Sequence, residues 1–152
     1  YIYYKDKDDL IVQIAREEFL KMSDSVMKDF DTASSFEAGL RYQWKKRSAY
    51  LLATPYSMLF FDQLKSSSYQ LKIYESSISG FREGMEKFIK KAIINDEISA
   101  LPLEVFWSIA FAPLYTLIRF HHDGKSLGGK PFQLSNEVME HTLTLVLKAL
   151  KK

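Results

Sequence analysis

The sequence predicts an all-α fold, and three observations lead to that expectation. Apolar residues recur every three or four positions along six segments, which is the spacing of amphipathic helices. The 152 residues include only 6 Gly and 4 Pro, little material for the many tight turns of a β-sandwich or barrel. With 47% hydrophobic and 26% charged residues, the composition is that of a globular domain and not of a disordered chain.

The first three expected helices begin at residues that favour helix starts. Asp6 is a good N-cap for the first helix, which extends to about residue 30. Ser34 or Ser35 caps the second helix. Pro55 stands in the first turn of the third, where proline is tolerated, and the serines at 66–68 end that helix.

The remaining three helices are bounded in the same way. The fourth carries an unbroken apolar stripe from Tyr74 to Ala92. We expect the fifth to run without interruption from Leu103 to about His122 and to stop at the following Gly124. The sixth begins after a Gly-rich loop, with Ser135 as its N-cap, and continues to the end of the chain.

Composition and charge argue against several classes of function. Because cysteine is absent, the chain has no disulfide framework, cysteine-ligated metal or cysteine nucleophile. The net charge of +2 is no electrostatic footprint for nucleic acid. The longest uncharged apolar stretch, residues 105–118, is shorter than the roughly 20 residues of a membrane span. We therefore expect a cytoplasmic domain without membrane contact.

Few motifs in the sequence indicate chemistry. His121, His122 and Asp123 are adjacent, so their side chains point about 100° apart on a helix and are a poor metal site. Nucleophile elbows, phosphate loops and dinucleotide fingerprints are absent. The short cationic run Lys45-Lys46-Arg47 lies on a helix and is expected to be a solvated face. We predict no catalytic residue, metal or cofactor, and no enzyme activity.

The last two helices are apolar on more than one side. The fifth is apolar all round, which requires burial all round, and the other helices of so small a domain cannot enclose both. We expect the two helices to form a four-helix bundle with a second copy of the chain. The alternative is a central fifth helix with an amphipathic sixth. The candidate interface residues are Phe106, Ile109, Val138, Thr142, Leu145 and Ala149.

Aromatic residues make up 14% of the chain, and several with polar tips lie on otherwise apolar helices. Buried Trp and Tyr need hydrogen-bond partners, and such a mixture suits a pocket for an apolar or aromatic small molecule. The alternative is a packed core without a cavity. The candidate ligand-binding residues are Trp44, Met58, Phe61, Phe81, Met85, Trp107, Phe111 and Tyr115.

The first ten residues, Tyr1-Ile2-Tyr3-Tyr4-Lys5-Asp6-Lys7-Asp8-Asp9-Leu10, carry a more specific signal. TetR-family transcriptional regulators have a pattern at the end of the recognition helix: Tyr, two variable residues, Phe, two more residues, Lys, two usually acidic residues and Leu. This sequence resembles that pattern, with Tyr4 in place of the usual Phe. The matching residues are Tyr1, Lys7, Asp8, Asp9 and Leu10.

The resemblance implies a bacterial repressor controlled by a ligand. Residues 1–9 would end a DNA-binding helix-turn-helix domain, most of which precedes this chain, and residues 10–152 would form the ligand-binding and dimerisation domain. Tyr1, Tyr3 and Lys7 match positions at or near DNA. The implied partners are a second copy, operator DNA and a small-molecule effector.

Two other functions remain open from the sequence. The chain could be a stand-alone all-α dimer that binds small molecules or another protein without binding DNA. It could also be an enzyme that uses the aromatic cavity, in which case Tyr115 and His121 are the residues to mutate. Neither function accounts for the first ten residues.

Overall fold

The computed structural model describes residues 3–65, 67–69 and 79–152. Within these ranges the chain is helical and contains no β-strand, so the all-α prediction is confirmed. The helices are α1 (Lys7–Met27), α2 (Phe36–Ala53), α3 (Pro55–Lys65), α5 (Ser79–Ile94), α6 (Leu103–Ala110), α7 (Ala112–Asp123) and α8 (Asn136–Leu150), with the short 3-10 helix η1 (Leu127–Gly129).

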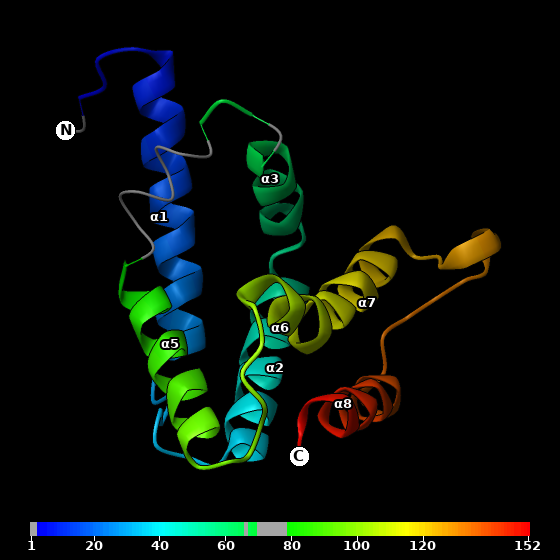
Figure 1. Ribbon diagram of the computed structural model, residues 1–152. Coiled ribbons are helices and arrows are strands. Elements are labelled where there is room, and N and C mark those ends of the chain that lie inside the picture. The colour runs from blue at the N-terminus through cyan, green and yellow to red at the C-terminus, as the bar shows by residue number, and fades with distance from the viewer. Residues whose placement is uncertain (1–2, 66, 70–78) are drawn as a thin grey trace.

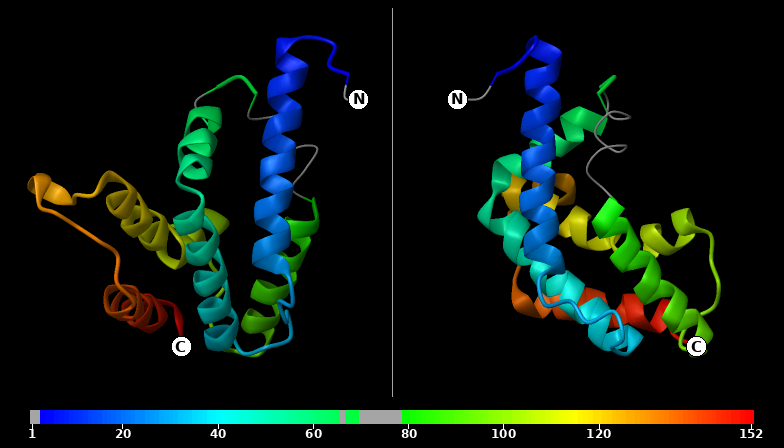
Figure 2. Two further views of the ribbon diagram at one scale, coloured as in Figure 1. Left: turned by 180° about the vertical axis from the view of Figure 1, so that it is seen from behind. Right: turned by 90° about the vertical axis from the view of Figure 1, so that its left-hand side faces the viewer.

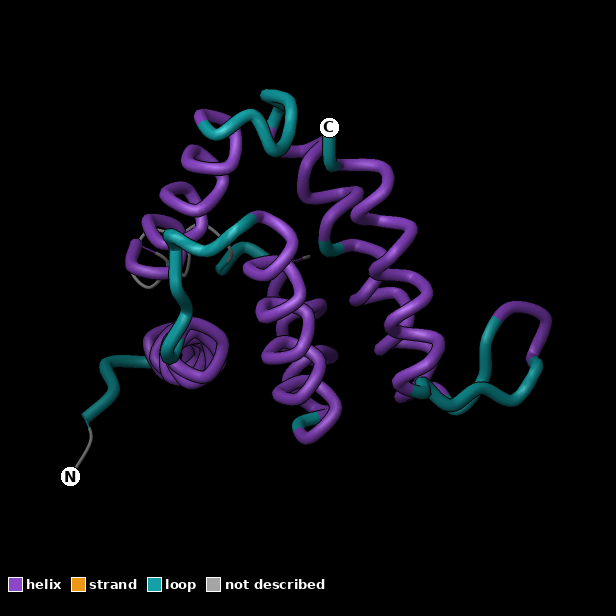
Figure 3. The backbone as a smooth tube through the Cα atoms, turned by 90° about the horizontal axis from the view of Figure 1, so that it is seen from below, coloured by secondary structure: helices purple, strands orange, loops and turns teal. Residues whose placement is uncertain are grey.

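Helix α2 is the centre of the arrangement. It packs against α1, α3, α5 and α7 (Figure 1). Helix α1 runs beside α2 in both views of Figure 2, with α5 against their lower ends, and α3 continues from α2 after a turn. Helix α8 packs on α6 and α7. The segment around η1 projects away from the helices (Figure 3).

The capping residues expected from the sequence make the expected hydrogen bonds. The Asp6 carboxylate accepts from the Asp9 backbone N–H at 2.8 Å, and the Asp9 carboxylate accepts from the Lys5 backbone N–H at 3.1 Å. That second bond is the main cause that lowers the pKa of Asp9. Ser35 caps α2 and Ser135 caps α8, each accepting from a backbone N–H at 3.2 Å. These bonds satisfy donors that a helix start leaves unpaired.

The expectation of one uninterrupted fifth helix is wrong. The chain forms α6 and α7 there, bent by 43° at Phe111. Pro113 lies in the first turn of α7, and proline lacks the N–H that would continue the hydrogen-bond ladder. Burial all round is also incomplete, because Leu103 is 62% exposed and Trp107 is 40% exposed in the single chain.

The start of the expected fourth helix, including Tyr74 and Ile78, lies outside the described residues, and α5 is described from Ser79.

Among the described helices, none alone has the length and apolar character needed to cross a membrane. The bent pair α6 and α7 together meets that requirement by length and composition only.

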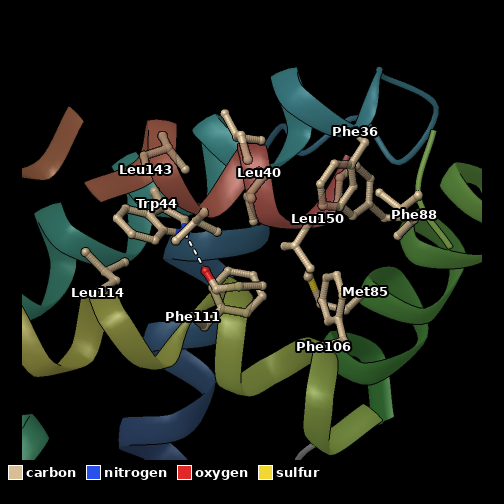
Figure 4. Close-up of a cluster of buried hydrophobic side chains, with 14 of the residues drawn as sticks. Phe36, Leu40, Trp44, Met85, Phe88, Phe106, Phe111, Leu114, Leu143 and Leu150 are labelled. Atoms are coloured by element: carbon tan, nitrogen blue, oxygen red, sulfur yellow. Dashed lines mark hydrogen bonds between the residues drawn. The ribbon is translucent and has the colours of Figure 1, made fainter. Parts of the chain in front are cut away.

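The core fills the space between α2, α5, α6, α7 and α8 (Figure 4). The Phe88 ring of α5 stacks on the Phe36 ring at 5.7 Å and meets the Phe30 ring edge-on at 5.2 Å. Gly39 on α2 allows this approach, because a Cβ at that position would collide with the Phe88 ring. Phe88 is held by rings on two sides and has little freedom to move away.

We predict that Gly39→Ala lowers the free energy of unfolding by about 1–3 kcal/mol, because the added methyl group overpacks the core at Phe88. Urea denaturation followed by circular dichroism measures the change. Gly80→Ala is the matched control, since a Cβ at Gly80 meets no atom within 4 Å. That change should be neutral or stabilise by up to about 1 kcal/mol. Equal effects at both glycines would contradict the close approach at Gly39.

Candidate ligand-binding site

A pocket of about 330 Å³ lies between α1, α2, α3, α6 and α7. Its volume is at the small end of the range for pockets that take small organic molecules. Most of the lining is apolar, and the polar side chains come from α3 and α7. The lining residues are Phe19, Met22, Leu51, Met58, Phe61, Asp62, Leu64, Lys65, Trp107, Ala112, Tyr115, Thr116 and Arg119.

Aromatic rings form much of the pocket wall. The Trp107 ring of α6 stacks on the Tyr115 ring of α7, with centroids 5.7 Å apart and planes 16° apart. The Phe19 ring of α1 meets the Phe61 ring of α3 edge-on at 6.3 Å. These walls offer flat faces and ring edges, which favour contact with an apolar or aromatic molecule.

Charged groups lie on one side of the pocket. The Asp62 carboxylate and the Arg119 guanidinium form an ion pair at 2.6 Å, and the nearby carboxylate raises the pKa of Arg119. The Lys65 ammonium lies 5.9 Å from the centroid of the Trp107 ring. Asp62 thus neutralises one of the two cations, and Lys65 forms no ion pair with a described residue.

Arg47 does not belong to a solvated face, and that expectation is wrong. The residue is 5% exposed. Its Nε donates to the Gln43 side-chain oxygen at 3.1 Å, and its Nη1 donates to the Tyr115 hydroxyl at 2.7 Å. The guanidinium carbon lies 3.9 Å from the centroid of the Phe111 ring and 5.1 Å from that of Phe81.

Helical spacing explains the burial of Arg47. Phe36, Leu40, Gln43, Arg47 and Leu51 follow one another at intervals of three or four residues, and all of them are buried. Arg47 therefore lies on the inner stripe of α2, whereas Lys45 points to solvent. The expectation groups Arg47 with its neighbours Lys45 and Lys46 because all three are cations, although the helical periodicity predicts that position 47 is internal.

The structure brings together four of the eight residues expected to bind ligand. Met58, Phe61, Trp107 and Tyr115 line the pocket, from three different helices. The other four lie elsewhere: Trp44, Met85 and Phe111 are buried in the core, and Phe81 is half-buried against the Arg47 guanidinium.

Trp44 has a structural partner that explains its place in the core. Its indole N–H donates to the Ala110 carbonyl at 2.8 Å (Figure 4). Ala110 is the last residue of α6, where helix carbonyls lack partners within the helix. Trp44 therefore ties α2 to the bend between α6 and α7.

Sequence reasoning missed the part of the pocket that α1 forms, and on α2 it named Trp44, whereas Leu51 lines the pocket. Phe19, Met22 and Leu51 line it, yet the sequence shows them only as members of apolar stripes. An apolar stripe marks the inner face of a helix but does not say where that face leaves a cavity. The charged residues Asp62, Lys65 and Arg119 had no sequence signal beyond their charge.

The residues expected to contact DNA or a second copy of the chain differ in how far they are exposed. Tyr1 lies outside the described residues, and Tyr3 and Lys7 are exposed. On α8, Val138 and Thr142 are half-buried, and Leu145 and Ala149 are exposed. Ile109 on α6 is half-buried, whereas Phe106 is 4% exposed and lies in the chain's own core against Phe36 and Phe111.

The histidines at the end of α7 make structural hydrogen bonds. His121 Nδ1 accepts from the Leu134 backbone N–H at 3.0 Å, and His122 Nε2 lies 2.9 Å from the Leu51 carbonyl oxygen. They join α7 to the segment before α8 and to the end of α2. In the part of the chain that the structure describes, no group of three His, Asp or Glu side chains is placed to hold a metal ion.

The fold is similar to that of a solved regulator. A TetR family transcription regulator from Marinobacter aquaeolei VT8 superposes with a TM-score of 0.83 and 20% sequence identity, over 100% of this chain and 76% of that one. No protein-family model matches the chain, and no curated protein matches it. The chain therefore has a TetR-like fold.

We predict that Trp44→Phe lowers the free energy of unfolding by about 1–3 kcal/mol, because the buried Ala110 carbonyl loses its indole donor. Thermal and urea denaturation measure the loss. Trp107→Phe is the matched control at the only other tryptophan, which is 40% exposed, and it should change stability by no more than about 0.5 kcal/mol. A larger loss for Trp107→Phe than for Trp44→Phe would contradict this account of the core.

Proposed function

We propose that this chain is the ligand-binding and dimerisation part of a TetR-type transcription regulator, with no enzyme activity. The observation that carries the proposal is a TetR-like fold along the whole chain that encloses an apolar pocket. The match of Tyr1, Lys7, Asp8, Asp9 and Leu10 to the family pattern supports it independently. Such a regulator would work in the bacterial cytoplasm, with a helix-turn-helix domain on the N-terminal side of α1.

The proposed effector is a small apolar or aromatic molecule that occupies the pocket. Phe19 and Met22 on α1 and Tyr115 on α7 would contact the same ligand. A ligand shifts the protein between two conformations only if it binds one of them better. Helix α1 follows directly after the residues that resemble the DNA-binding junction. A ligand that favours another position of α1 would therefore change the distance between the two DNA-binding domains of the dimer.

The proposed dimer uses the outer face of α8 together with α6 and α7. Leu145 on α8 is 55% exposed in the single chain, and Val105 on α6 is 42% exposed. Apolar surface of this kind is covered in a two-fold symmetric four-helix arrangement. Two half-sites on DNA would then match the symmetry of the protein.

The regulation is tested with the protein as its gene encodes it. We expect it to enrich a palindromic site from random DNA duplexes, and the apolar fluorophore N-phenyl-1-naphthylamine to change its affinity for that site. Ala112→Leu places extra carbon atoms in the pocket, so at least about tenfold more fluorophore should be needed for the same change. Fluorescence anisotropy of labelled DNA measures both effects.

The control for that experiment is Ala38→Leu, which adds the same atoms at an exposed position of α2 away from the pocket. It should respond to the fluorophore like the unmodified protein. If no DNA sequence is enriched while the fluorophore still binds, a stand-alone small-molecule-binding protein becomes the better account. If no DNA sequence is enriched and the fluorophore also fails to bind, the pocket has no role as an effector site.

We predict that the protein sediments as a dimer and that Leu145→Glu makes it a monomer, because the change would bury an unpaired charge in the proposed interface. Analytical ultracentrifugation gives the mass. Leu127→Glu is the control, since Leu127 is 78% exposed in η1, in the segment that projects away from the helices (Figure 3). A dimer that survives Leu145→Glu would show that α8 is not at its centre.

A further inference from the structure

Arg47 is a buried cation, and the residues that the structure describes place no buried anion beside it. No described carboxylate forms an ion pair with its guanidinium, whose contacts are the Gln43 amide oxygen, the Tyr115 hydroxyl and the rings of Phe111 and Phe81. Buried charges are usually paired because removing them from water is costly. Neutral partners and ring faces offset that cost only in part.

Arg47 is connected to the pocket through Tyr115. Tyr115 lines the pocket, and its hydroxyl oxygen accepts from Arg47 Nη1 at 2.7 Å. A phenolic hydroxyl both accepts and donates, and the Tyr115 proton has no acceptor among the described residues. A hydroxyl whose oxygen is held by a cation is a stronger donor, because hydrogen bonds in a chain polarise one another.

We propose that the ligand of this pocket is an organic acid, with an aromatic or other apolar body and a single anionic group. This inference rests on the proposed effector pocket. The body occupies the space between Phe19, Met58 and Trp107, and the anionic oxygen accepts from the Tyr115 hydroxyl with the Arg47 charge directly behind it. The acid thereby supplies a negative charge that none of the described residues places beside Arg47.

The cations on the α3 and α7 side of the pocket are less suited to this role. Arg119 is already paired with Asp62 at 2.6 Å. Lys65 is exposed, where a charge pair contributes little because water and salt screen it. Arg47 is 5% exposed and is held in place by two hydrogen bonds, so its charge acts in a medium of low dielectric constant.

The test compares 2-naphthoate with 2-naphthalenemethanol, which share one ring system and differ in the anionic group. Isothermal titration calorimetry at pH 7 gives both affinities. We expect the unmodified protein to bind the acid at least about tenfold more tightly than the alcohol, as for a charge-assisted hydrogen bond. Arg47→Met should bring the ratio of affinities close to one and leave the affinity for the alcohol within about twofold.

Two further variants make the result specific. Lys46→Met removes the same charge from the neighbouring position of α2, outside the pocket, and should keep the preference for the acid. Tyr115→Phe removes only the hydroxyl and should lower the ratio by at least about threefold. This variant carries the test if Arg47→Met fails to fold by circular dichroism.

Other outcomes overturn the inference in recognisable ways. Equal affinities for acid and alcohol in the unmodified protein refute it and leave the proposed apolar effector pocket intact. Loss of the preference in Lys65→Met, with its retention in Arg47→Met, shows that the acid is received at the exposed lysine. Failure of both compounds to bind refutes the effector pocket itself.

Discussion

The contact between α2 and the bend in the chain at Phe111 organises the rest of the structure. Pro113 interrupts the helical hydrogen bonds, and the Trp44 indole supplies a donor to the Ala110 carbonyl at the end of α6. The bend of 43° gives α6 and α7 different directions. Phe106 of α6 enters the core, while its neighbour Trp107 stacks across the bend on Tyr115 of α7, at the wall of the pocket.

The same central helix connects the core to the proposed effector site. Trp44 and Arg47 are neighbours on the inner side of α2. Trp44 holds the end of α6, and Arg47 holds the Tyr115 hydroxyl on α7. Both polar groups are buried with partners, as buried polar groups must be. A ligand that contacts Tyr115 would therefore act on a side chain already fixed to the centre of the fold, and movement of α7 would be transmitted to α2.

Helix α1 has a different relation to the pocket. It contributes Phe19 and Met22 to the wall, but its first turn is held by local bonds from Asp6 and Asp9. It packs mainly on α2 and α5, and its Phe19 ring also meets the Phe61 ring of α3. In the proposed mechanism this helix carries the signal toward DNA, because it lines the pocket and follows directly after the residues that resemble the DNA-binding junction.

Much of the fold follows from the sequence alone, because caps and helical periodicity are local properties. Asp6, Ser35 and Ser135 mark helix starts, and the apolar stripes mark inner faces. Tertiary structure decided the rest. Trp44 belongs to the core because the end of α6 brings the Ala110 carbonyl to its indole N–H. The hydrogen-bond partner of Arg47 is Tyr115, 68 positions along the chain. The pocket is the space left between side chains of five helices, so the sequence of one helix alone does not predict its position. The sequence by itself thus determined the helices and their inner faces, while only their packing decided where a ligand could enter, because a cavity is a property of the space between elements.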